Sequence, residues 1–168
     1  MSPTSPQDRL FGLWRRLAPL PGGRRLFSWI LGWIIPYSGT IGARVRLLEP
    51  GHCILLLRDR RGVRNHLRSI HAVAITNAGE LASGLAMTTA LPPGTRAIVT
   101  QLATEYVKKA RGVIVVECRV KDPPRPAAPM DVLVESTLTD SAGDIVARVQ
   151  AKWLVAPPEG KAHAEPRK

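Results

Sequence analysis

Several polar side chains that helix packing does not require lie close together in this 168-residue chain. They are Asn65, His66, His71, Asn77, Glu80 and Ser83. Glu80 carries the most information, because it is the only Asp, Glu, Lys or Arg in the otherwise apolar or small-residue run 69–90. A carboxylate buried without a partner is costly, so such a group pairs, takes up a proton or faces a water-filled site. Acid-base chemistry is one interpretation, and a solvated stripe on a helix is the other.

The spacing of the two strongest candidates points to more than one subunit. His71 and Glu80 are nine residues apart, which places them on nearly opposite sides of one straight helix. A dimer would instead bring the helix start of one chain to Glu80 of the other. Free amide groups and the helix dipole near His71 and Ala72 favour negative charge. An oxyanion-binding site beside a carboxylate is therefore expected between subunits.

The elements that position these residues follow from the pattern around them. The run 69–90 is long and free of proline, which predicts a buried helix that ends before Pro92 and Pro93. Strands are predicted by β-type stretches between turn residues, at 43–48, 52–58, 96–107, 112–120, 131–139 and 144–155. Two strands, a helix and then about four more strands indicate an α+β fold, in which an antiparallel sheet wraps around one long central helix.

The ends of the chain differ from this body. Residues 9–38 predict a helical extension before a domain at 40–156, and residues 1–8 and 157–168 are expected to be disordered. The apolar segment 26–35 is too short to cross a bilayer as a helix. With its neighbouring arginines it suits a peripheral membrane contact through residues 10–35. Packing across the sheet or a dimer partner is the favoured alternative.

Charge and cysteine content limit the partners. Twenty-four Lys and Arg against 13 Asp and Glu give a net charge of +11, which favours an anionic partner such as a membrane surface, nucleic acid or coenzyme A. Nucleic acid is not expected, because no basic helix alternates with aromatic residues. Cys53 and Cys118 lie in apolar runs without metal-ligand spacing. Buried free thiols in the cytoplasm, and no metal site, are the expectation.

One segment resembles a known family. Asn65, His71 and Glu80, with strands on both sides of a buried helix, resemble the active-site segment of hotdog-fold acyl-CoA thioesterases of the phenylacetyl-CoA thioesterase type. Residues 104–112 (TEYVKKARG) resemble a second segment of these enzymes. The family usually has His-Gly-Gly where this chain has His71-Ala72-Val73, and Asp is the more frequent acid at Glu80. The sequence looks closest to an uncharacterised hotdog branch.

The resemblance implies roles for these residues. Glu80 would act as nucleophile or general base, the Ala72 amide would bind the oxyanion, and Asn65 would hold the carbonyl or position water. His71 would orient the loop or hydrogen-bond the acyl group, and Ser83 would orient the carboxylate or water. Phosphates of coenzyme A would be bound by Arg68, Lys108, Lys109 and Arg111. Coenzyme A would enter as part of the substrate, with no separate cofactor.

The resulting hypothesis is a homodimer, or a tetramer, that hydrolyses acyl-CoA thioesters at sites between subunits. A hotdog dimer that binds acyl-CoA without hydrolysis is the main alternative, favoured by the His71-Ala72-Val73 sequence. A lipid-handling protein at the membrane surface is a second alternative. A transcription regulator is a weaker one, since no helix-turn-helix pattern is found.

Overall fold

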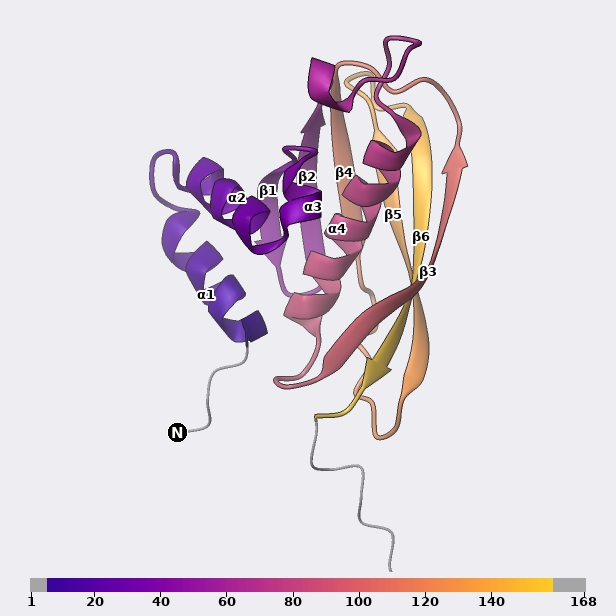
Figure 1. The fold of residues 1–168 in the computed structure, drawn as a ribbon. Helices are drawn as coiled ribbons and strands as arrows, with labels where there is room; N and C mark the ends of the chain where they lie inside the picture. Colours follow the sequence, from indigo (N-terminus) through magenta and orange to yellow (C-terminus); the bar gives the residue numbers. More distant parts are fainter. Residues whose placement is uncertain (1–5, 159–168) are drawn as a thin grey trace, which may run out of the picture.

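A computed structural model describes residues 6–158. The helices are α1 (Pro6–Leu17), α2 (Gly23–Ile34), α3 (Pro36–Gly39) and α4 (Ala72–Ala90), with a short 3₁₀ turn at Arg61–Val63. The strands are β1 (Arg44–Glu49), β2 (His52–Arg58), β3 (Arg96–Tyr106), β4 (Val113–Arg119), β5 (Met130–Thr139) and β6 (Ile145–Ala156). They form one antiparallel six-stranded sheet in the order β1-β2-β4-β5-β6-β3. Figure 1 shows the sheet curving around α4, which confirms the predicted hotdog fold.

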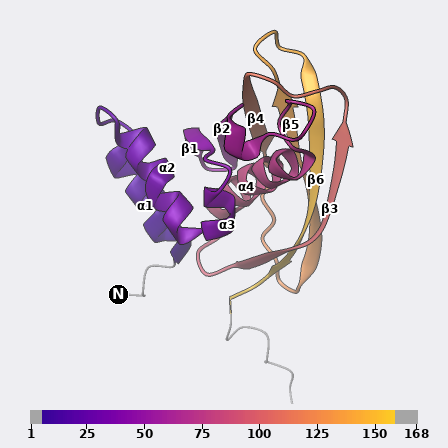
Figure 2. The ribbon, with the colours of Figure 1, turned by 45° about the horizontal axis from the view of Figure 1, so that its top comes forward.

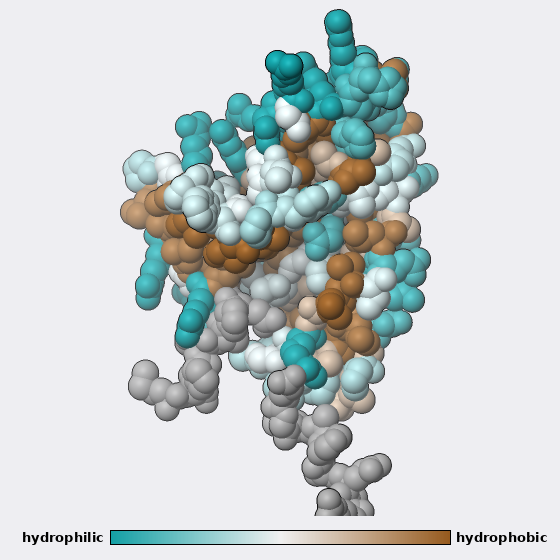
Figure 3. Space-filling model, viewed as in Figure 1, coloured by the Kyte–Doolittle hydropathy of each residue, from teal (hydrophilic) through white to brown (hydrophobic). Residues whose placement is uncertain are grey.

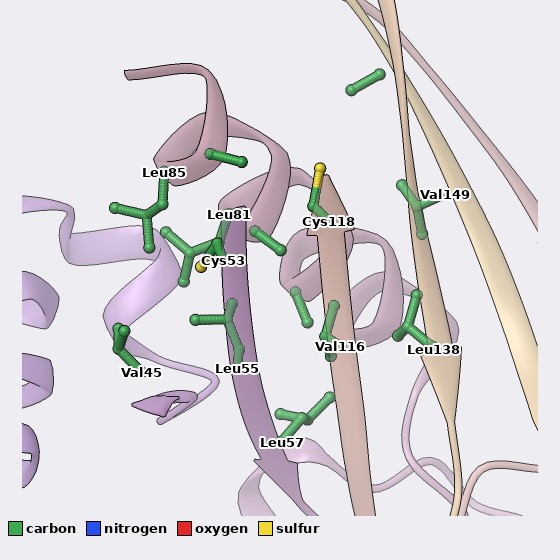
Figure 4. Close-up of a cluster of buried hydrophobic side chains, with 14 of the residues drawn as sticks. Val45, Cys53, Leu55, Leu57, Leu81, Leu85, Val116, Cys118, Leu138 and Val149 are labelled. Atoms are coloured by element: carbon green, nitrogen blue, oxygen red, sulfur yellow. The ribbon is translucent and has the colours of Figure 1, made fainter. Parts of the chain in front are cut away.

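The core lies between α4 and the concave face of the sheet. α4 contacts all six strands, and Leu81 and Leu85 lie toward Cys53 and Leu55 of β2 (Figure 4). The helix approaches β6 closely at Gly79, where an added Cβ would lie 2.4 Å from the Cβ of Val149. A small residue on this face of α4 is therefore required by packing.

Both cysteines belong to this core. Cys53 and Cys118 are buried free thiols on the paired strands β2 and β4. Burial raises the pKa of Cys118 to about 11 and raises the pKa of Cys53 as well. Both thiols therefore stay protonated and unreactive at neutral pH.

The central helix is shorter than predicted. The helix expected from residue 69 begins at Ala72, after His71 in an extended conformation. Ser69 and Ile70 instead close a loop, in which Ile70 bridges to Arg64 and the His71 amide donates to the Val63 carbonyl at 2.8 Å. The cap at His71 prevents the helix from including residues 69–71. The apolar residues of the run 69–90, on which the prediction rested, did not indicate this cap.

The expected tails differ in extent from the structure. Residues 6–8, expected in the N-terminal tail, begin α1, since proline is tolerated in the first turn of a helix. Pro157 is buried and Pro158 lies next to Gly94, so the first two residues of the expected C-terminal tail pack on the domain. Residues 1–5 and 159–168, the rest of both tails, lie outside the described part.

The helical extension packs on the sheet edge through one side only. Trp14 of α1 meets Phe27 of α2 edge to face at 5.1 Å between ring centroids, and Phe27 and Leu31 are buried. Figure 2 shows α1 and α2 beside β1, on the side of α4 away from β3. The opposite side of α2 exposes Trp29 and Trp33. No helix within residues 6–158 combines the length and apolarity that a membrane span needs.

Candidate active site

The loop before α4 is organised by Asn65. Its Oδ1 accepts hydrogen bonds from the amides of Leu67 (2.9 Å) and Ser69 (3.2 Å) and from the Ser69 hydroxyl (3.2 Å). Arg68 takes a left-handed conformation in the same loop, with φ of 56°. The carbonyl of Asn65 is therefore committed to loop structure, and only its NH₂ group is left to meet a substrate or water.

The start of α4 leaves the Ala72 amide without an acceptor among the described residues. His71 Nδ1 accepts from the Val73 amide at 3.1 Å, so the side chain expected to orient the loop caps the helix. The exposed Ala72 amide has no acceptor among the described residues. A helix N-terminus with a free amide attracts a developing oxyanion. The Val73 amide is therefore occupied by His71, whereas the Ala72 amide, which was assigned to the oxyanion, is free to donate.

Strand β3 braces this helix start. Thr76 Oγ1 lies 2.8 Å from both Thr104 Oγ1 and the Tyr106 hydroxyl, and that hydroxyl donates to the Ala72 carbonyl at 3.2 Å. The first turn of α4 is therefore fixed against the edge of the sheet. A partial signal was present in the sequence, because Thr104 and Tyr106 lie in the segment that resembles the thioesterases.

Glu80 lies on the middle of α4, partly buried. Desolvation by burial raises the pKa of its carboxyl above the usual value. Among the described residues it has no ion-pair or hydrogen-bond partner for that carboxylate. A carboxylate that burial makes more basic, and that has no partner, is a candidate general base.

Asn77, one turn before Glu80, is a candidate to which the sequence assigned no role. It is 7% exposed, and its Oδ1 is buried without a hydrogen-bond partner among the described residues. Asn77 and His71 both line a cavity of about 210 Å³ that reaches Tyr37 and Arg64. A buried acceptor without a donor is costly, so this side chain is available to a bound molecule or water. In the sequence, Asn77 was recognisable only as a polar amide side chain within the largely apolar run 69–90.

Ser83 does not reach the Glu80 carboxylate. Its hydroxyl donates to the main-chain carbonyl of Glu80 at 2.8 Å and accepts from the Trp153 indole at 3.3 Å. The side chain is fully buried. Ser83 therefore connects α4 to β6, since it faces the sheet and not the site.

The basic candidates divide into two groups. Lys108 is held between Asp140 at 2.7 Å and Asp144 at 2.6 Å, and these carboxylates raise the pKa of its amine. That charge is already compensated, because Lys108 ties the end of β3 to the β5–β6 hairpin. Arg68, Lys109 and Arg111 are exposed. A backbone bond of 2.9 Å from Ile70 to Ala110 brings their two loops together near the start of α4.

One chain does not assemble all of these groups. No contact joins the Glu80 carboxylate to Asn65 or His71 among the described residues. The helix start, the loop at Asn65 and the exposed cations share one end of the molecule, whereas Glu80 lies about two turns along α4. Within residues 6–158 no group of three His, Cys, Asp or Glu side chains is placed to hold a metal ion.

Comparison with known structures places this geometry in context. The crystal structure designated genomics APC5556 is 25% identical over 90% of this chain and 99% of its own, with a TM-score of 0.78. A Pseudomonas aeruginosa protein of unknown function, described as a probable thioesterase, is 26% identical over 82% of this chain and 96% of its own, with a TM-score of 0.69. A Streptococcus mutans protein bound to acetyl CoA shares the fold, at 20% identity over 69% of this chain and 90% of its own, with a TM-score of 0.60.

The sequence itself matches a family model. Curated protein sequences give no match. The model described as Domain of unknown function (DUF4442) matches residues 23–155, which include α2 and all of the hotdog body except the last residue of β6. The suspected resemblance to hotdog-fold thioesterases is confirmed at the level of the superfamily, and the chain belongs to the DUF4442 family.

Proposed function

We propose that this protein is an acyl-CoA thioesterase whose active sites form between two copies of the chain. The observation that carries the proposal is Glu80, a partly buried carboxylate of raised pKa without an ion-pair partner among the described residues. The similar Pseudomonas aeruginosa protein, described as a probable thioesterase, supports this chemistry. The Streptococcus mutans protein shows that a protein of this fold binds acetyl CoA.

The edge strand β3 supports the dimer. β3 pairs with β6 on one side only, and Ile98, Leu102 and Tyr106 along it are 63%, 42% and 49% exposed. A long apolar edge strand invites pairing with another strand. A second β3 would extend the sheet across a twofold axis and bring two copies of α4 side by side. The helix start of one chain would then face Glu80 of the other.

The proposed reaction needs two contributions from the protein. Glu80 takes a proton from water as the water oxygen attacks the thioester carbonyl, and the Ala72 amide donates to the oxyanion that forms. The carbon–sulfur bond then breaks, and the proton passes from Glu80 to the leaving thiolate. The products are a carboxylic acid and coenzyme A. Arg68, Lys109 and Arg111 would meet the phosphates of coenzyme A as fixed positive charges.

Hydrolysis of short, medium, long and aromatic acyl-CoAs, followed with a thiol-detecting dye, tests the proposal. Loss of a general base costs about 10²- to 10⁴-fold, so Glu80→Gln should lower kcat at least that far while the dimer persists. Glu135→Gln, a surface carboxylate that accepts from Gln150, is the matched control and should keep the wild-type rate. Equal rates for Glu80→Gln and wild type would disprove the role of Glu80.

A specific observation favours the binding protein as second candidate. The Val73 amide is occupied by His71, and Ala72 and Val73 carry side chains where the resembling enzymes have glycines. An oxyanion site with one donor is weaker than a site with two. Saturable binding of acyl-CoA with no turnover of any substrate would select this alternative.

A further inference from the structure

The outer face of α2 is apolar but covered by nothing in the structure. Trp29 and Trp33 are 62% and 73% exposed, and their ring centroids lie 6.0 Å apart. The helical extension also exposes the apolar side chains of Leu20, Leu26, Ile34 and Tyr37. Figure 3 shows hydrophobic surface along the helical extension, with hydrophilic side chains projecting beside it. An apolar patch with a polar rim marks an interaction surface.

A basic groove adjoins the two tryptophans. It has a volume of about 540 Å³ and is lined by Arg25, Arg44, Arg58 and Arg60 together with Trp29 and Trp33, without an Asp or Glu among its described lining. Arg25, Arg44 and Arg58 have no ion-pair partner among residues 6–158. Arg60 has no ion-pair partner among these residues either, so four uncompensated arginines around one groove attract an anion.

The groove is built by the backbone that surrounds it. Arg60 donates to the Thr40 carbonyl at 2.6 Å and passes over Gly42, where φ is 62° and an added Cβ would lie 2.9 Å from the guanidinium. At Gly39 an added Cβ would lie 2.4 Å from the Gly32 carbonyl oxygen, so α2 and α3 touch through glycines. These close approaches fix the backbone of α2 and α3 beside the groove and the position of Arg60.

We propose that this face binds the surface of an anionic lipid membrane, independently of the proposed hydrolysis. Lipid phosphates would enter the groove, and the rings of Trp29 and Trp33 would lie at the level of the head groups, as tryptophan does at interfaces. A small soluble anion would neutralise the arginines but leave the apolar patch around Trp29 and Trp33 exposed to water. A membrane covers both, and the exposed Arg15 and Arg16 on neighbouring α1 add to the attraction.

The position of this face fits the proposed dimer. α2 packs on β1, which is one edge of the sheet, and β3 is the other edge. A dimer through β3 would leave the groove of each copy uncovered. Two such faces in one particle would raise the apparent affinity for a vesicle.

Vesicle sedimentation with the full chain is the first test. Binding is expected to vesicles of phosphatidylcholine with phosphatidylglycerol, and to weaken with salt, but not to phosphatidylcholine alone. Each arginine near a membrane contributes about 1 kcal/mol, so Arg25→Gln with Arg58→Gln should weaken binding roughly 30-fold. Arg125→Gln with Leu133→Ser, exposed residues elsewhere, should bind as wild type does. No preference for the anionic vesicles, or equal loss in this control, would overturn the proposal.

Tryptophan fluorescence tells which face touches the lipid. Trp14 and Trp153 are buried, so a blue shift and protection from acrylamide on adding vesicles would report Trp29 and Trp33. Trp29→Ser with Trp33→Ser should abolish the shift and weaken sedimentation about tenfold or more. Sedimentation with both rings still open to acrylamide would contradict the proposal, as would release by millimolar phosphate or coenzyme A. A fall in particle mass of this variant without vesicles would assign the face to contact between copies.

Discussion

Glu80 is chemically unlike the other carboxylates of the described chain. Asp59 has a low pKa because Arg64 hydrogen-bonds to it, and Asp140 has a low pKa because Lys108 does. Glu80 is partly buried and has no such basic partner, so desolvation raises the pKa of its carboxyl. An unfavourable environment retained in a core helix is typical of a functional group, since stability is lost to keep it.

This environment predicts a pH dependence of stability. The unfolded chain ionises Glu80 near the ordinary glutamate pKa of 4.5, whereas the folded chain keeps that proton to higher pH, so the free energy of unfolding falls as pH rises through this window. Glu80→Gln removes the ionisation and should be more stable than wild type at pH 7, with the difference shrinking below pH 4.5. Denaturant unfolding at both pH values measures it. The raised pKa would be contradicted if Glu80→Gln, compared with wild type, lost free energy of unfolding on going from pH 4 to pH 7.

Ser83 shows where residue spacing was misleading. One turn from Glu80, it was expected to serve the carboxylate, but its hydroxyl bonds to Trp153. Ser83→Ala should therefore lower stability by about 1–3 kcal/mol, because the buried indole N–H loses its acceptor, and leave the pH profile of hydrolysis unchanged. Thermal unfolding and pH-rate measurements separate the two effects. A shifted pH profile at unchanged stability would restore the predicted role.

At the level of elements, the prediction from sequence succeeded wherever turn residues bounded apolar stretches. The strands predicted at 43–48, 52–58, 131–139 and 144–155 lie within about one residue of their observed bounds. The start of α4 was predicted three residues too early. The hydrogen bond by which the His71 side chain caps the helix cannot be recognised in the sequence. The polar contacts of Thr76 with β3 were equally hidden, since a cross-element bond leaves no periodic signal.

The contact of α4 with β6 gives a prediction at this scale. Gly79→Ala should destabilise the fold by about 1–3 kcal/mol, because the new methyl group meets Val149 in a close-packed core. Gly12→Ala is the matched control: no atom lies within 4 Å of its added Cβ in α1, so it should gain up to about 1 kcal/mol from helix propensity. Chemical denaturation of both variants compares them. Equal effects of the two changes would mean that α4 can move away from the sheet.

At the scale of the whole molecule, the sequence located the parts of the site but not their assembly. Asn65, His71 and Ala72 come together at one end, and Glu80 lies apart from them on the same helix. Nine residues of separation predicted this for one chain. A second chain that completes the site would pair with the edge strand β3. The exposed apolar side chains of β3 indicate such an interface only when the sheet order is known, and the sequence does not contain that order.

The edge strand predicts that assembly and activity are lost together. Ile98→Lys places a charge on the exposed edge of β3, so light scattering should give the mass of one chain, and hydrolysis should fall with it. Leu133→Lys, equally exposed at 63% but on β5, should keep both. A monomer with full activity would show that one chain holds a complete site.

Mixing two inactive variants tests the shared site directly. Ala72→Pro removes the amide assigned to the oxyanion, and proline is tolerated at the first position of a helix after an extended residue such as His71. In a mixed dimer of this variant with Glu80→Gln, one site carries both changes and the other carries neither, if each site takes Glu80 from one chain and Ala72 from the other. Equal mixing should then restore about a quarter of wild-type activity. Each site built within one chain would stay impaired in every mixture, so an absence of recovery despite exchange of subunits would locate the whole site in one copy.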